Sequence, residues 1–146
     1  MNDAAAYNED VPARTMILIL DDEFDVLNII RIGLQKSGFN AFGFTDPLLA
    51  LEHLKVNAAN YRLAISDIRM PGMTGFEFVR EVKKINPTIA VLLMSAFEVN
   101  GNELLLTSLK SIKIEGIIQK PISLSKLRSI VRRQLNITIR SLKRSR

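Results

Sequence analysis

Short apolar runs alternate with amphipathic segments along this chain. Four of the five runs are apolar without alternation, and the run at residues 40–44 is weaker. The runs lie at residues 16–20, 40–44, 62–66, 89–94 and 115–119. Continuous apolar runs of this length are typical of strands that are covered on both faces in a parallel sheet. The pattern therefore predicts five strands.

Five helical patterns follow these runs. They begin near residues 23, 45, 74, 102 and 123. Gly38 signals the end of the first helix. Thr45 or Asp46 is the expected N-cap of the second helix, and Pro47 suits its first helical position. Thr74 and Glu77 have the spacing of a capping box at the start of the third. The last pattern carries an apolar stripe that can continue past Leu135, although the β-branched stretch after it has a poor helix propensity.

Strand-then-helix units of this length predict an α/β fold. We expect a flavodoxin-like, doubly wound, five-stranded parallel sheet in the order 2-1-3-4-5, with helices on both faces and right-handed crossovers. The chain has 146 residues, which is enough for a single domain. We place this domain at residues 15–135, after a flexible segment at 1–14. Residues 136–146 form either a basic tail or an extension of the last helix.

Polar side chains follow four of the predicted strands. Asp21 and Asp22 come after the first strand, Asp67 after the third, Ser95 after the fourth and Lys120 after the fifth. In this fold these strand ends converge at one edge of the sheet. Three neighbouring carboxylates repel each other, so they either raise a pKa or hold a cation. Because no His or Cys lies nearby in this pattern, a hard ion such as Mg²⁺ is the expected occupant.

Lys120 and Ser95 extend this prediction from a metal site to a phosphoryl pocket. A lysine charge, a hydroxyl and free backbone N–H groups beside Mg²⁺ suit the oxygens of a phosphoryl group. A carboxylate in such a pocket can act as the nucleophile and form an acyl phosphate. Asp67 is the candidate, because we expect it between the metal ligands and the cationic side.

Four segments, "LILDDE", "SDIRMPGMTGFEF", "LLMSA" and "IIQKPI", resemble the successive signatures of the response-regulator receiver domain of two-component signalling. The resemblance covers roughly residues 15–135. It implies that Asp67 accepts phosphate from a phosphohistidine on a sensor histidine kinase. It also implies that Asp22, Asp67 and the backbone carbonyl of Arg69 bind Mg²⁺ directly, while Asp21 acts mostly through water.

The same resemblance assigns the remaining pocket residues. Ser95 and Lys120 contact the phosphoryl oxygens, as do the backbone groups of Ile68 and Ala96. The bond between Lys120 and the proline after it is expected to be a cis peptide. Receivers usually have Tyr or Phe three residues before the lysine, as a rotamer switch coupled to the serine. This chain has Ile117 there, so the usual aromatic readout is in doubt.

Two bulky residues, Arg69 and Phe97, occupy the positions that flank the route of the hydrolytic water in the family. We therefore expect a long-lived phosphoryl state. The chain is expected to be a stand-alone response regulator that catalyses only its own phosphorylation and dephosphorylation. It would signal to a downstream protein target through altered contacts. The sequence allows both a monomer and a homodimer.

Composition and charge limit the kinds of site that the chain can contain and its expected location in the cell. The chain has no cysteine, which excludes disulfides and thiolate metal sites. Its first residues lack the pattern of a secretory signal, and no apolar run is long enough to span a membrane, so we expect a cytoplasmic protein. The net charge is +5, but residues 120–146 hold nine Lys and Arg and no acid.

The basic C-terminal stretch supports an alternative function of a different class. A phosphorylation-independent interaction or nucleic-acid-binding protein could use this scaffold and contact phosphates through residues 126–146. No aromatic residue lies there to stack on bases, and no helix-turn-helix follows. A metal-dependent phosphatase with an aspartyl nucleophile is a further alternative, but its usual Asp-x-Asp after the first strand is replaced here by the adjacent pair Asp21 and Asp22.

Overall fold

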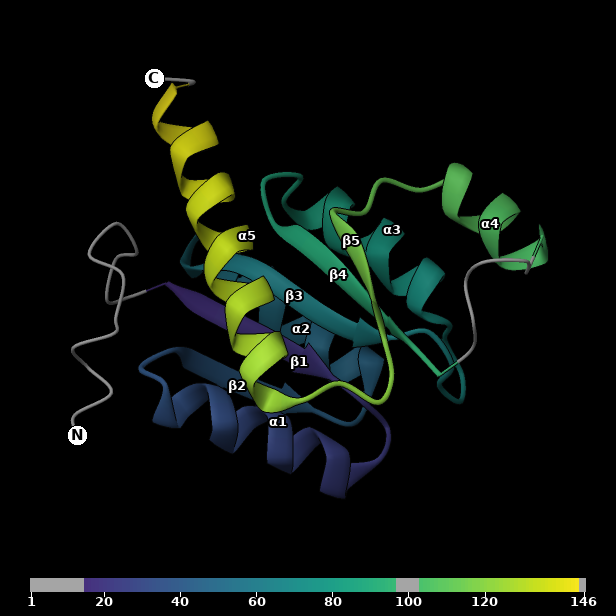
Figure 1. The fold of residues 1–146 in the computed structure, drawn as a ribbon. Helices are drawn as coiled ribbons and strands as arrows, with labels where there is room; N and C mark the ends of the chain where they lie inside the picture. Colours follow the sequence, from purple (N-terminus) through teal and green to yellow (C-terminus); the bar gives the residue numbers. More distant parts are fainter. Residues whose placement is uncertain (1–14, 97–102, 145–146) are drawn as a thin grey trace.

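The computed structural model of the chain describes residues 15–96 and 103–144, and it contains one five-stranded parallel sheet (Figure 1). The strand order is β2-β1-β3-β4-β5, which confirms the predicted order. The strands are β1 Met16–Leu20, β2 Asn40–Phe44, β3 Tyr61–Asp67, β4 Ala90–Ser95 and β5 Gly116–Gln119. The helices are α1 Phe24–Lys36, α2 Pro47–Asn57, α3 Gly75–Ile85, α4 Glu103–Lys110 and α5 Leu124–Arg144, with a short 3-10 turn at Ala58–Asn60.

The sheet is covered on both faces. α1 and α5 pack on one face, while α2 and α3 pack on the other, where Leu109 of α4 and residues after α4 also make contact (Figure 1). Along β1, Ile17 and Ile19 belong to the core under α1 and α5, whereas Leu18 and Leu20 belong to the core under α2 and α3. All four are fully buried, which explains why the run is apolar without alternation.

β2 lies at one edge of the sheet, and this position explains its weaker pattern. It pairs with β1 alone among the described strands. Its Ala41 is buried under α1, while Asn40 and Phe42 are exposed. An edge strand needs fewer apolar residues than a central one, because part of its surface faces solvent.

The helix ends use the residues that the sequence indicates. Asp46 caps α2, because its carboxylate accepts a hydrogen bond of 2.9 Å from the N–H of Leu48. Thr74 and Glu77 form a reciprocal capping box at the start of α3. Gly38 follows α1 with a φ of 94°, a left-handed conformation that favours glycine. These caps fix where α2 and α3 begin relative to the strand ends.

α5 continues without interruption through residues 136–144, so the described part of this stretch is an extension of the last helix. Leu135 and Ile139 are buried in the core under α1 and α5, and Thr138 is also buried. This burial outweighs the low helix propensity of the β-branched stretch. Within the described residues, no helix is long and apolar enough to cross a membrane.

Candidate functional site

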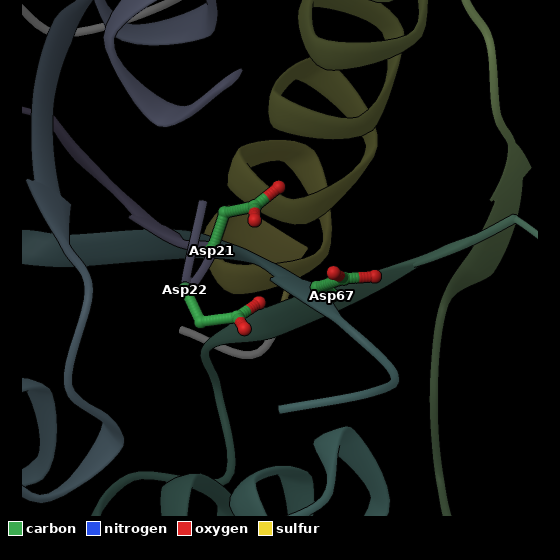
Figure 2. Close-up of side chains that lie close together, drawn as sticks. All are labelled: Asp21, Asp22 and Asp67. Carbon is green, nitrogen blue, oxygen red and sulfur yellow. The ribbon is translucent and has the colours of Figure 1, made fainter. Parts of the chain in front are cut away.

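Three carboxylates meet at the carboxyl edge of the sheet. Asp21 and Asp22 follow β1, and Asp67 ends β3, its neighbour in the sheet (Figure 2). One carboxylate oxygen of each lies within 4.8 Å of the others. The strand order therefore brings together residues that are more than 40 positions apart in the chain, as the sequence predicts.

Asp21 is held rigidly between β1 and α1. Its backbone N–H donates to the carbonyl of Phe44 over 3.1 Å. One of its carboxylate oxygens accepts from the N–H of Glu23 over 2.9 Å, just before α1 begins. The side chain is fully buried, whereas the neighbouring Asp22 is exposed. Asp21 therefore bonds the backbone at the start of α1 and also belongs to the carboxylate cluster.

Asp67 is nearly buried, with 8% of its surface exposed. Its Oδ1 accepts a hydrogen bond of 3.0 Å from the N–H of Ile68, which also donates to the carbonyl of Met94. Burial raises the pKa of the Asp67 carboxyl above its ordinary value, the charge of Lys120 opposes this rise, and the charge of Asp21 adds to it. The ionised form of Asp67 is therefore held in an unfavourable setting.

Lys120 brings the positive charge to this cluster from the end of β5. Its Nζ lies 3.1 Å from Oδ2 of Asp21 and 3.4 Å from Oδ2 of Asp67. Burial lowers the pKa of Lys120, but the charges of Asp21 and then Asp67 outweigh burial, so the pKa lies above its ordinary value. The backbone N–H of Lys120 donates to the carbonyl of Ser95 over 2.7 Å, and the bond from Lys120 to Pro121 is cis.

The donor set fits a divalent cation. Among the described residues, three carboxylates face one ammonium group, which leaves an excess of two negative charges at this edge. All the candidate ligand atoms are oxygens, which hard ions such as Mg²⁺ prefer. Asp22 is exposed, so solvent and ions can reach the cluster.

The other predicted site residues lie around this cluster. Ser95 ends β4, is almost fully buried, and pairs with Gln119 across the sheet. Arg69 follows Ile68 in the loop after β3, and its side chain is exposed. Ala96 is exposed beside the end of β4. Phe97 lies outside the described residues.

Ile117 lies in β5, and β4 separates this strand from β3, which ends at Asp67. It pairs with Leu93 in β4 and is half-buried. It packs against the core on the α3 face of the sheet, the same core that Leu109 and Ile112 contact. An aliphatic side chain thus links β5 to the segment around α4.

A recess of about 580 Å³ opens beside Lys120. It lies between α1 and the segment that leads from β5 into α5, and its lining is mainly apolar. Ile29 of α1 lines this recess with 60% of its surface exposed, and Ala96 and Pro121 lie on the side of the site. The carboxylate cluster is therefore flanked by an apolar surface.

Gly75 contributes to the site in a way that the sequence did not reveal. A Cβ at this position would lie 2.5 Å from the carbonyl oxygen of Asp67 and 2.9 Å from the Cα of Ile68. The N–H of Gly75 donates to the carbonyl of Ile68 over 2.8 Å. In the sequence, Gly75 stands in a loop-like stretch after Pro71 and Gly72. Its place directly after the Thr74 cap was the one signal of a close approach between α3 and β3.

Gly75→Ala is expected to displace Asp67, because backbone atoms cannot move aside as a flexible side chain can. We expect a destabilisation of about 1–3 kcal/mol and a loss of roughly tenfold or more in Mg²⁺ affinity. Urea unfolding and calorimetric Mg²⁺ titration measure the two effects. Gly72→Ala is the control: Gly72 has a φ of 82° but open space around it, so its strain should lower stability without weakening Mg²⁺ binding. Equal Mg²⁺ affinities in the two variants would contradict this role of Gly75.

Comparison with known proteins places this geometry in a family. Residues 17–132 match the model of the response regulator receiver domain. The putative two-component response regulator ARR21 of Arabidopsis thaliana is 32% identical over 116 residues, which are 80% of this chain and 18% of that protein. The transcriptional regulatory protein ZraR of Klebsiella oxytoca is 34% identical over 111 residues, 76% of this chain and 24% of that protein. The chain thus spans about a fifth to a quarter of the length of these relatives.

Other similar proteins are matched over most of their length. Sporulation initiation phosphotransferase F of Bacillus subtilis is 26% identical over 119 residues, which cover 82% of this chain and 92% of that protein. The crystal structure of the chemotaxis response regulator CheY4 of Vibrio cholerae is 25% identical with a TM-score of 0.71, and the match covers 82% of this chain and 98% of that chain. A receiver domain structure from Clostridium thermocellum has a TM-score of 0.74 at 23% identity, which shows the shared fold; the match covers 90% of this chain and 99% of that chain.

Proposed function

Because the chain belongs to the response regulator receiver domain family of two-component signalling, we propose that its Asp67 accepts a phosphoryl group from a phosphohistidine of a sensor histidine kinase. The observation that carries this proposal is the position of Asp67 between excess carboxylates and the ammonium group of Lys120. A carboxylate in such a setting is poised as a nucleophile, since phosphorylation removes part of its unfavourable charge density from the buried oxygen.

The transfer itself needs little covalent chemistry from the protein. A carboxylate oxygen of Asp67 attacks phosphorus, the N–P bond of the phosphohistidine breaks, and its electron pair remains on the imidazole. The ammonium group of Lys120 would then contact the incoming phosphoryl oxygens in place of the carboxylates. These oxygens carry the developing charge. Positioning and charge neutralisation therefore supply the catalysis, and the domain modifies only itself.

Mg²⁺ is the proposed cofactor. Asp22, Asp67 and the backbone carbonyl of Arg69 would hold the ion directly, and the bound ion would neutralise charge on the phosphoryl oxygens. Asp21 suits an indirect role, because it is fully buried and both of its carboxylate oxygens accept hydrogen bonds, from Glu23 and from Lys120. Such a bonded, buried carboxylate orients the other groups and strengthens the negative field.

Ser95 and the backbone N–H groups of Ile68 and Ala96 are the proposed contacts of the bound phosphoryl group. The N–H of Ile68 already donates to Asp67, so it lies next to the acceptor oxygen atoms. Ser95 and Ile117 occupy the switch positions. Since Ile117 has no hydroxyl or ring, we propose that any signal passes through aliphatic packing between β5 and the segment around α4 rather than through an aromatic flip.

The recess beside Lys120 is the proposed docking surface for the kinase. Its apolar lining, including the exposed Ile29, offers a surface on which a kinase domain can dock with its phosphohistidine facing Asp67. The proposed output is a change in contacts with a downstream protein. Stand-alone action stays a prediction. The long lifetime of the phosphoryl group, expected from Arg69 and Phe97, also stays a prediction from the sequence.

Intact-mass spectrometry after incubation with acetyl phosphate tests the proposal. We expect one added phosphoryl group in the presence of Mg²⁺ and none with EDTA. Hydroxylamine should remove the label, because it cleaves an acyl phosphate and leaves a phosphate ester of Ser or Thr intact. Label that resists hydroxylamine, or that forms equally well in EDTA, would contradict phosphorylation of Asp67. Absence of any label from a folded, Mg²⁺-binding protein would contradict the proposed chemistry with small donors.

A further inference from the structure

The outer face of α5 carries a straight row of basic side chains. Lys126, Arg133 and Arg140 follow one another at intervals of seven residues, and all three are exposed. Seven residues are close to two helical turns, so the three side chains project from the same side of the helix. Together they extend over about 21 Å. Lys143 is exposed one turn beyond Arg140.

The continuity of α5 is what turns these residues into a single surface. The helix includes all residues from Leu124 to Arg144, and Leu127, Val131 and Leu135 are fixed in the core beneath it. The row is therefore presented by a rigid, anchored helix and not by separate points on a loose tail. No acidic residue occurs in residues 120–146, so this helix offers no carboxylate to neutralise the row from within.

The chemistry of the face indicates which kind of anion it suits. The apolar side of α5 is buried against the sheet, so this helix has no free apolar face to insert into a lipid surface. Protein interfaces have an apolar centre, whereas the outer face of α5 has one large exposed apolar residue, Ile137. The exposed row includes Arg133 and Arg140, and the guanidinium fork matches the oxygens of a phosphate group.

We propose that the outer face of α5 binds the phosphate backbone of a nucleic-acid duplex without reading its base sequence. The 21 Å row is as long as about six base-pair steps. The absence of aromatic residues on α5 agrees with backbone contact alone, since nothing there can stack on bases. This function is independent of phosphorylation at Asp67, so it is tested with the unphosphorylated chain.

Fluorescence anisotropy with a labelled, mixed-sequence duplex of roughly two helical turns provides the test. The α5 variant combines Lys126→Ala, Arg133→Ala and Lys143→Ala. The matched control removes the same charge elsewhere, by Lys55→Ala, Lys84→Ala and Lys110→Ala on α2, α3 and α4, all exposed. A charge-preserving variant, Lys126→Arg with Lys143→Arg, tests the face without changing its charge.

We expect the wild type and the control to bind the duplex in the micromolar range, with an affinity that falls steeply between about 50 and 200 mM salt. The α5 variant should bind at least about tenfold more weakly, and its plot of log affinity against log salt should be shallower by about three, one for each lost phosphate contact. The charge-preserving variant should bind as the wild type does.

Three results would overturn the proposal. The first is a wild type that gives no anisotropy change at the lowest salt. The second is equal weakening of the α5 variant and the control, which would show that net charge alone matters. The third is tighter binding to polyglutamate than to the duplex at equal salt, which would assign the face to an acidic protein. Circular dichroism verifies that every variant keeps its fold.

Discussion

Asp67→Asn is expected to abolish phosphoryl addition and to stabilise the metal-free protein. The amide cannot form an acyl phosphate, so labelling by acetyl phosphate should fall by at least about a thousandfold. The same substitution should increase the free energy of unfolding of the metal-free protein. Burial and the charge of Asp21 hold the pKa of the Asp67 carboxyl above its ordinary value, so its ionised form costs stability that a neutral amide does not. Intact mass and thermal unfolding in EDTA measure the two effects.

The pH dependence of this stability gain follows from the direction of the pKa shift. Between the ordinary value of 3.8 and the raised folded value, the unfolded chain releases its proton first, so the wild type loses stability as pH rises. The gain from Asp67→Asn should therefore be full above the folded pKa and should vanish below 3.8. Asp46→Asn is the control, because Asp46 caps α2 from an exposed position and Asn caps equally well. A lower melting temperature for Asp67→Asn at neutral pH would contradict this account.

The positions of the candidate site residues could be predicted because the carboxyl ends of the strands lie next to one another in this fold. Apolar runs without alternation indicate a parallel sheet covered on both faces, and this architecture brings the carboxyl ends of its strands to one edge. Asp21, Asp67 and Lys120 stand directly at such ends, so no knowledge of side-chain packing was needed to bring them together. The helix caps could be predicted for a similar reason, since Thr74, Glu77 and Asp46 act through neighbours in the sequence.

Features that depend on packing between distant elements could not be predicted. Gly75 matters because α3 passes close to the backbone of Asp67, and its local sequence reads as an ordinary loop. The helical state of residues 136–144 depends on the burial of Ile139 in the core under α1 and α5, which outweighs the local preference for other conformations. The division between a fully buried Asp21 and an exposed Asp22 likewise arises from the tight turn between β1 and α1.

Lys120→Met is expected to destabilise the protein by about 3 kcal/mol in the absence of divalent ions. Methionine keeps much of the apolar stem but removes the only ammonium group that contacts Asp21 and Asp67 among the described residues. Asp21 would then remain fully buried with its charge unpaired, which is far costlier than losing a surface ion pair. Lys84→Met is the matched control, because Lys84 pairs with Glu81 where both side chains are exposed, and its loss should cost at most about 0.5 kcal/mol. Urea unfolding in EDTA compares the two variants.

Adding Mg²⁺ shows whether the lost stability is electrostatic. A cation bound by the three carboxylates would supply the positive charge that Lys120 provides in the wild type, so Mg²⁺ should stabilise Lys120→Met more than the wild type. Phosphoryl labelling of Lys120→Met should remain low even in saturating Mg²⁺, because the ammonium group that would contact the phosphoryl oxygens is still absent. If Mg²⁺ stabilises both proteins equally, the destabilisation by Lys120→Met comes from lost packing. In that case the buried carboxylates do not depend on the charge of Lys120.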